Sequence, residues 1–192
     1  MLNEIVKKLR DGLFLAASRT CGEQYVEPFI RKQYNLEESG SNDFDALNKA
    51  NGIRYEIKSA KVLKSRQNLK KQSILQRILD EVHKSQLNRM VAFKDRFTID
   101  YDANIQNVKR DHFDFLIYAL LFEDCIEVFE IPKKLIGKFF IPNWSDKHGR
   151  YDELGKSGQF NITKTSISMH EENYKRDIFT YEQLKKVYET ME

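Results

Sequence analysis

The fold is decided by residues 45–58, which read DALNKANGIRYEIK. Asn51-Gly52 is a turn dipeptide, because both residues tolerate the positive φ that tight hairpin turns require. From residue 53 to residue 58, apolar and polar side chains alternate, which is the period of a strand with one buried face. The stretch therefore predicts an antiparallel hairpin whose second strand presents its polar residues on the face opposite the core.

Three charged side chains of this hairpin are predicted to meet at one place. Glu56 and Lys58 share a strand face, about 7 Å apart at Cα, and Asp45 on the preceding strand can fold back beside them. Hard oxygen ligands with no His or Cys pair nearby favour Mg²⁺ over zinc. Two carboxylates and an ammonium at a sheet edge suit metal-assisted phosphodiester hydrolysis. Asp43 competes with Asp45, which we favour because its spacing to Glu56 allows the shortest hairpin.

The order of an Asp, a short hairpin and Glu-Ile-Lys resembles the active-site signature of the PD-(D/E)XK nucleases. The wider stretch 42–61 is similar to small type II restriction endonucleases of the PvuII type. It departs from the signature at Phe44, which stands where the proline of the name would be.

This resemblance implies roles for four residues. Asp45 and Glu56 would be catalytic ligands of Mg²⁺, with the backbone carbonyl of Ile57 as the third ligand. Lys58 would orient or deprotonate the attacking water, or stabilise charge in the transition state. Glu23 or Glu27, in the first part of the chain, would be the accessory acid that the family often places near the metal.

The resemblance also implies a biological setting. We expect a Mg²⁺-dependent, sequence-specific endonuclease of double-stranded DNA, acting as a type II restriction enzyme in the bacterial cytoplasm beside a cognate methyltransferase. A homodimer would match a short palindrome, because each subunit then cuts one strand through the same contacts. A DNA repair or junction-resolving nuclease is the alternative within the same chemistry. A non-catalytic DNA-binding module is the alternative from another class.

The length of the chain and the distribution of its charges bear on the domain organisation and on DNA binding. The 192 residues predict a single domain, with the helices and catalytic sheet in residues 1–140 and the DNA-recognition strands and closing helix in residues 141–192. The net charge is only +3, but residues 61–89 carry eight Lys and Arg against two acids, and residues 100–130 carry eight acids against two bases. This uneven distribution predicts a basic face and an acidic region beside a phosphate-binding cleft.

Other sequence features exclude several classes of protein. Cys21 and Cys125 belong to no CxxC or Cys/His cluster, so we expect reduced, buried, intracellular thiols. The sequence has neither an apolar signal stretch nor a run long enough to span a membrane. It also lacks a P-loop and a Gly-rich dinucleotide turn. The motifs expected of kinases, NTPases and Rossmann oxidoreductases are therefore missing from the sequence.

Periodicity predicts the remaining elements. The patterns indicate helices at 3–17, 22–34, 74–88, 132–138 and 180–191, and strands at 104–109, 113–122, 125–131 and 159–170. Residues 113–122 are almost continuously apolar, as in a central strand covered on both faces. Pro28 conflicts with an uninterrupted helix, and Thr180 with Gln183 predicts a capping box. The class is α/β (α+β), with a restriction-endonuclease-like mixed sheet flanked by helices and a β-rich C-terminal recognition region.

Two sets of residues are candidates for DNA contacts. Basic residues near the catalytic strand could neutralise phosphates. Polar residues of the last third, including a predicted strand that ends at His170, could reach base edges. Gln106 and Lys109 are three residues apart on a strand and so are expected to face opposite sides. The phosphate set is Lys61, Lys64, Arg66, Lys70, Lys71 and Lys109, and the base-reading set is Lys156, Asn161, Lys164, Thr165 and His170.

Overall fold

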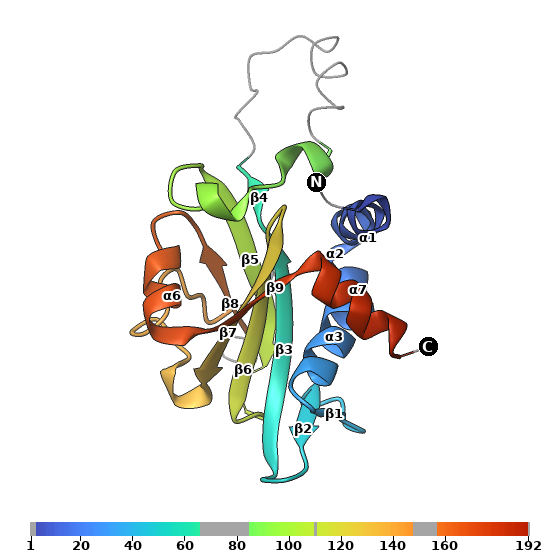
Figure 1. Cartoon of the computed structure of the whole chain (residues 1–192). Helices are drawn as coiled ribbons and strands as arrows, with labels where there is room; N and C mark the ends of the chain where they lie inside the picture. Colours follow the sequence, from blue (N-terminus) through green and yellow to red (C-terminus); the bar gives the residue numbers. More distant parts are fainter. Residues whose placement is uncertain (1–2, 66–84, 110, 148–156, 192) are drawn as a thin grey trace.

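A six-stranded mixed sheet forms the centre of the computed structural model, which describes residues 3–65, 85–109, 111–147 and 157–191 (Figure 1). The strand order is β1-β2-β3-β6-β7-β9. β3 and β6 are parallel, and the other neighbouring pairs are antiparallel. The strands are β1 (Glu37–Glu38), β2 (Ala46–Asn48), β3 (Ile53–Lys61), β6 (Phe115–Leu121), β7 (Cys125–Pro132) and β9 (Lys175–Thr180).

A second sheet of three antiparallel strands lies against one face of the first. Its order is β4-β5-β8, and β5 contacts β3. Val62 alone separates β4 from β3 in the chain, so the polypeptide passes directly from the large sheet into the small one. The strands are β4 (Leu63–Lys64), β5 (Tyr101–Lys109) and β8 (Ser157–Ile162).

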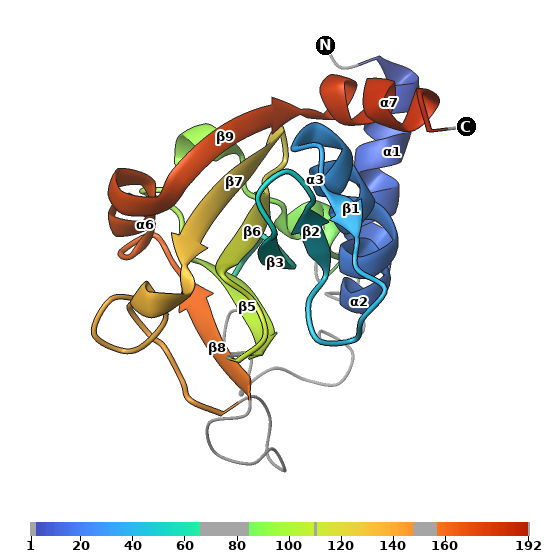
Figure 2. The same ribbon diagram turned by 90° about the horizontal axis from the view of Figure 1, so that it is seen from below.

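Helices cover the other face of the large sheet and one end of the molecule. α1, α3 and α7 lie together on that face, whereas α6 lies on the side of the small sheet (Figures 1 and 2). The helical elements are α1 (Glu4–Leu15), α2 (Ser18–Thr20), the π-helix η1 (Cys21–Val26), α3 (Glu27–Gln33), α6 (Ile167–Tyr174) and α7 (Tyr181–Glu189), with short 3₁₀ turns η2 (Leu87–Arg89), η3 (Phe93–Asp95) and η4 (Lys133–Leu135).

The central strand β6 shows why the core has two layers. Leu116, Tyr118 and Leu120 pack into the cluster shared with the small sheet, while the residues between them pack against the helices. Every residue from 116 to 121 is therefore buried. This confirms the prediction, made from its continuous apolar run, that the strand is covered on both faces.

The helix predicted at 22–34 is interrupted by a π turn just before Pro28. In an α-helix the proline ring would clash with the carbonyl four residues earlier. Here the Glu27 N–H bonds to the Gly22 carbonyl five residues back, and α3 begins at Glu27. The wider turn relieves the conflict that the sequence indicated.

Local patterns predicted several elements well. The helix at 3–17 corresponds to α1, and the strands at 104–109, 113–122 and 125–131 correspond to β5, β6 and β7. The capping box at Thr180 is confirmed: its hydroxyl accepts from the Gln183 N–H at 3.2 Å, and the Gln183 side chain accepts from the Thr180 N–H at 2.7 Å. The predicted helix at 74–88 lies largely outside the described residues, and the helix at 132–138 is only the 3₁₀ turn η4.

The strand predicted at 159–170 is wrong beyond Ile162. Residues 163–166 form a turn in which the Ser166 side chain accepts from the Thr163 N–H at 3.0 Å, and α6 begins at Ile167. Ile167, His170 and Tyr174 then follow helical spacing and are buried. Burying these three on one helix face overrides the alternation in the sequence.

The C-terminal region contributes both to the central sheet and to the helical layer. β9 forms the edge of the large sheet beside β7, and α7 contacts α1 and α3. The architecture is thus a mixed α/β fold in which residues on both sides of position 140 build the central sheet. Among the described residues, no helix is both long and apolar enough to cross a membrane.

Candidate active site

Strand pairing between β2 and β3 ends next to Asp45. The Asp45 side chain bonds to the β3 backbone where a paired strand would otherwise do so. β2 pairs with β3 only as far as the Ala46–Tyr55 pair. The Asp45 N–H donates to the Tyr55 carbonyl at 2.9 Å, and two residues further along β3 the Ile57 N–H donates to Asp45 Oδ2 at 2.7 Å. The edge of β3 beyond this point therefore presents its backbone groups to side chains instead of to a strand.

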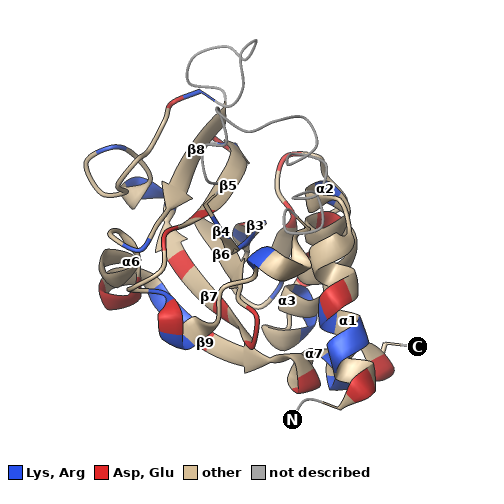
Figure 3. Ribbon diagram, turned by 90° about the horizontal axis from the view of Figure 1, so that it is seen from above, with Lys and Arg blue, Asp and Glu red and all other residues tan. Residues whose placement is uncertain are grey.

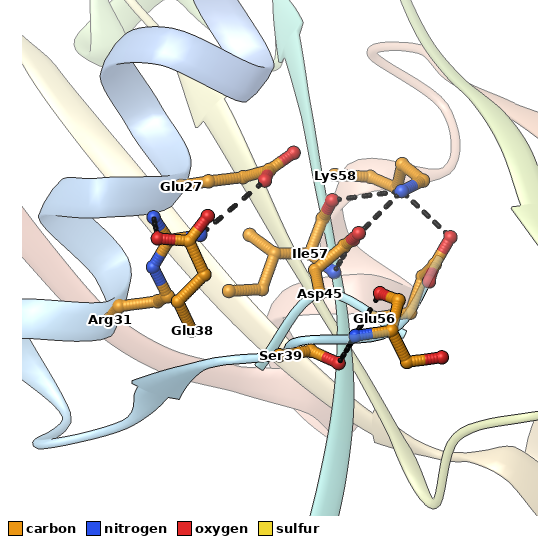
Figure 4. Close-up of polar contacts among 9 residues, drawn as sticks. Glu27, Arg31, Glu38, Ser39, Asp45, Glu56, Ile57 and Lys58 are labelled. Atoms are coloured by element: carbon orange, nitrogen blue, oxygen red, sulfur yellow. Dashed lines mark hydrogen bonds and ion pairs between the residues drawn. The ribbon is translucent and has the colours of Figure 1, made fainter. Parts of the chain in front are cut away.

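Lys58 lies at the centre of this opening. Its Nζ is 3.0 Å from Asp45 Oδ2, 3.1 Å from the Ile57 carbonyl and 2.7 Å from Glu56 Oε1 (Figure 4). The three charged residues predicted from the hairpin thus meet, together with the carbonyl of Ile57. The structure brings together the whole set that the sequence proposed for catalysis.

Both Glu56 and Lys58 are more buried than the alternating pattern predicted. Glu56 is 0% exposed, and the Lys58 side chain is 19% exposed. The sequence indicated one buried face, but β5 and the small sheet cover the second face of β3 as well. Burial of a carboxylate is tolerated when an opposite charge lies close, and Lys58 supplies that charge.

The protonation behaviour of the cluster follows from this burial. Burial raises the pKa of Glu56, and the positive charge of Lys58 opposes that shift. Burial alone would lower the pKa of Lys58, but the carboxylates of Glu56 and Asp45 outweigh it and hold that pKa above its usual value. The ammonium form of Lys58 is therefore favoured in the free protein.

An open cleft of about 1220 Å³ lies over the cluster. One wall comes from η1, α3 and the segment before β2, and the facing wall comes from β5, whose Lys109 bonds across to Asn42. Asp45, Ile57 and Lys58 line it, whereas its described lining does not include Glu56, which lies behind Lys58. A long phosphate-bearing ligand could reach Lys58 from solvent.

Glu23 and Glu27 are four positions apart and both line the cleft, but they differ in burial and in partner. Glu23 forms an exposed pair with Arg19 at 2.9 Å. Glu27 is largely buried beside Arg31 at 3.9 Å, and burial followed by the charge of Asp45 raises the pKa of Glu27 to about 7 (Figure 4). Of the two candidate acids, Glu27 is the more buried one, and its charge interacts with that of Asp45.

Sequence reasoning missed the ion pairs of Arg31 and the close packing at Gly22 in this wall. Arg31 also pairs with Glu38 at 3.3 Å and so joins α3 to β1. A Cβ added to Gly22 would lie 3.3 Å from Ser59 Oγ, so the glycine lets η1 approach β3 closely. The glycine was the available signal, since Gly often marks close backbone approach.

On the facing wall, Gln106 and Lys109 both line the cleft. Their three-residue spacing predicted opposite faces, but the register between β5 and β8 shifts between Ile105 and Val108. Asn107 in this bulge has φ 53°. The extra residue of a bulge reverses the alternation beyond it, which brings both side chains to one side. Lys109 also donates to the carbonyl of Asn42 across the cleft.

Lys61, predicted to bind phosphate, is instead occupied within the fold. Its Nζ donates to the carbonyls of Phe14 at 2.8 Å and Ala16 at 2.5 Å, and to Gln86 Oε1 at 3.0 Å. An ammonium has three protons to donate, and all three are used. Lys61 therefore caps the C-terminal end of α1, where a cation also complements the helix dipole.

The base-reading candidates that the structure describes are not among the residues lining the cleft. Thr165 bonds to Thr163, Lys164 pairs with Asp100 at 2.8 Å, and Asn161 donates to Asp102 at 2.9 Å. Lys64 is an exposed residue of β4. Arg66, Lys70, Lys71 and Lys156 lie outside the described residues.

His170 is a core residue and cannot read bases from this position. It is 0% exposed, and its Nδ1 lies 2.7 Å from the Tyr118 hydroxyl. Its ring stacks on Phe160. Burial lowers its pKa to about 4.

The basic face predicted from residues 61–89 falls mostly outside the described residues and stays a prediction. In the described residues, positions of Lys and Arg (blue) and of Asp and Glu (red) are interspersed along the ribbon (Figure 3). Acids of the stretch 100–130 are paired with bases from elsewhere, as in Asp114 with Arg54 at 2.9 Å and Glu127 with Lys175 at 3.1 Å. Most of the basic segment lies in residues 66–84, which the structure does not describe.

The residues of the site fit a divalent metal in their chemistry. Glu56 is fully buried, and its Oε2 has no hydrogen-bond donor among the described residues. Two carboxylates and a carbonyl form the all-oxygen set that Mg²⁺ prefers. No cluster of three or more His, Cys, Asp or Glu side chains suited to a metal occurs in the described ranges. The proposed set is smaller, because its third ligand is a backbone carbonyl.

The sequence was also compared with known proteins. No family model and no curated protein matches the chain.

Proposed function

We propose that this protein is a Mg²⁺-dependent endonuclease that hydrolyses phosphodiester bonds of double-stranded DNA. One observation carries the proposal: the ammonium of Lys58 lies within 3.1 Å of Asp45, Glu56 and the Ile57 carbonyl, at a strand edge open to a cleft. Cation-binding oxygens and a positioned ammonium are the groups that phosphodiester hydrolysis needs.

The chain's own residues divide this work. Asp45 and Glu56, with the Ile57 carbonyl, would hold the metal, and Glu27 would be its accessory acid. When bound, Mg²⁺ supplies Lewis acidity that activates water and neutralises phosphoryl charge. Lys58 would orient the attacking water or stabilise charge on the phosphate, and Lys109 and Gln106 would contact the DNA backbone across the cleft.

Type II restriction by a homodimer is the specific form that we propose, since the hairpin and its triad resemble those enzymes. A repair or junction-resolving nuclease would use the same site. A binding module that lost catalysis is the rival from another class. The meeting of Asp45, Glu56 and Lys58 favours a catalyst, because a degenerate site need not keep all three together.

Digestion of supercoiled plasmid with Mg²⁺ or with EDTA tests the proposal. We expect nicking or linearisation with Mg²⁺ only, and discrete bands on a mapped plasmid if the enzyme is a restriction endonuclease. Smeared products, or preference for branched substrates, would indicate the repair class. Binding without any cleavage across plasmids and branched substrates would favour the binding module.

A further inference from the structure

Lys58 occupies the position that the proposed metal would need. Its Nζ is 2.7 Å from Glu56 Oε1, 3.0 Å from Asp45 Oδ2 and 3.1 Å from the Ile57 carbonyl (Figure 4). These three oxygens are the complete ligand set proposed for the metal. Mg²⁺ needs its oxygens at about 2.1 Å. An ammonium and a metal ion cannot share the space between the same three oxygens.

Access to one of the three ligands, Glu56, is also restricted in the free protein. Glu56 is fully buried, and the cleft is lined by its neighbours Ile57 and Lys58. A cation that enters from the cleft therefore reaches Glu56 only after the Lys58 side chain has moved.

The ammonium is held firmly in this position. Lys58 neutralises a carboxylate that is otherwise buried, and removing one partner of such a pair leaves an uncompensated charge. Its two other contacts, to Asp45 and to the Ile57 carbonyl, hold it from the opposite side. The contacts that stabilise the free protein thus oppose metal binding.

We propose that Lys58 is the resident cation of the DNA-free site and competes with the divalent metal for the same three oxygens. This inference rests on the proposed function, because it takes those oxygens to be metal ligands. Its consequence is that metal affinity is low until a phosphate in the cleft draws the ammonium away. DNA would then promote metal binding, and by linkage the metal would promote DNA binding equally.

Binding of Mn²⁺ to the DNA-free protein tests this competition. Mn²⁺ shares the oxygen preference of Mg²⁺, and the free ion can be counted by electron paramagnetic resonance. We expect Lys58→Met to bind Mn²⁺ at least about tenfold more tightly than wild type, as when the competent state is about a tenth of the population. Lys175→Met is the matched control, because Lys175 also pairs with a buried carboxylate, Glu127. Neither Lys175 nor Glu127 is among the described residues that line the cleft. This variant should bind like wild type.

The melting temperature gives a second readout, and it also shows whether Lys58→Met folds. Lys58→Met leaves Glu56 without its partner, so Mn²⁺ should raise the melting temperature of this variant and not that of wild type. Lys58→Gln, a neutral side chain that can still hydrogen bond, serves if Lys58→Met does not fold.

The outcomes separate the inference from the proposed function. Equal Mn²⁺ affinity in wild type and the Lys58 variants, abolished in each by Asp45→Asn, would overturn the competition and keep the metal site. Absence of Mn²⁺ binding in the Lys58 variants would overturn the competition together with the metal site on which the proposed function depends.

Discussion

Two carboxylates in the central sheet, Glu56 on β3 and Glu127 on β7, are alike in burial and in pairing with a lysine. Each is 0% exposed, and each has a lysine as its near cation: Lys58 at 2.7 Å and Lys175 at 3.1 Å. Burial raises the pKa of both, that of Glu127 to about 7. By burial and pairing alone, either could be a functional group.

Their surroundings differ in the way that matters for chemistry. Glu127 lies on a strand paired on both sides, opposite Leu120 of β6 and Ile178 of β9. Glu56 lies where β2 has left β3, so that Asp45 and the Ile57 carbonyl face the same lysine beside a cleft. A buried ion pair becomes a candidate site when an open strand edge adds further oxygens and an approach from solvent.

The largest expected effect separates Asp45 from its neighbour Asp43. Asp45→Ala should abolish cleavage, because it removes one ligand and the side chain that bonds to the Ile57 N–H. Asp43 is exposed and outside the described lining of the cleft, so Asp43→Ala should cut at nearly the wild-type rate. Single-turnover cleavage with saturating Mg²⁺ measures both. The opposite order would move the ligand assignment to Asp43.

Lys58 and Lys175 give the next largest contrast. Lys58→Ala should slow single-turnover cleavage by at least about a hundredfold, the scale for losing a positioned charge-stabilising group. Lys175→Ala should leave the rate nearly unchanged. Because Lys58 is buried with Glu56, its loss should also lower the unfolding free energy, which an exposed strand lysine would not do. Wild-type cleavage by Lys58→Ala would favour the binding module.

The pH dependence of the unfolding free energy should show the effect of the raised pKa of Glu127. Because the carboxyl pKa of Glu127 is raised, the folded state retains the proton to a higher pH than the unfolded state does. The unfolding free energy therefore falls as pH rises from about 4.5 to about 7. Glu127→Gln removes that cost. We expect nearly equal unfolding free energies at pH 4, and a variant more stable by up to about 3 kcal/mol at pH 8. Urea unfolding at both pH values measures the difference, and a less stable variant at pH 8 would show that the pair with Lys175 is net stabilising.

The smallest effect distinguishes two lysines near the cleft. Lys109→Ala should flatten the salt dependence of DNA binding, by about 0.9 in the log–log slope for one lost phosphate contact. Lys61→Ala should keep the slope and lower stability instead, because Lys61 bonds to the end of α1. Anisotropy titrations of a mixed-sequence duplex at several salt concentrations compare the two. A flatter slope for Lys61→Ala alone would reverse their roles.

The sequence predicted the parts of this site that depend on local structure. The turn at Asn51-Gly52 and the alternation after it placed Asp45, Glu56 and Lys58 together, because a short hairpin fixes its own register. The capping box at Thr180 was predictable for the same reason.

What depended on distant segments could not be predicted. The burial of Glu56 requires β5 to cover the second face of β3. The orientation of Gln106 depends on a bulge, and His170 becomes a core residue only because a helix follows β8. Lys61 was assigned to phosphate from its place beside the catalytic strand, and the sequence could not show its acceptors, Phe14 and Ala16, because they lie far away in the chain.

The most direct test is the rate of Mg²⁺-dependent plasmid nicking by Glu56→Gln and Glu127→Gln, measured beside wild type. The two variants lose the same charge from the same kind of buried pair. We predict that wild type and Glu127→Gln nick at equal rates with Mg²⁺ and not with EDTA, while Glu56→Gln is slower by at least about a hundredfold. Equal rates for all three proteins, or equal loss in both variants, would contradict the assignment of catalysis to the open edge of β3.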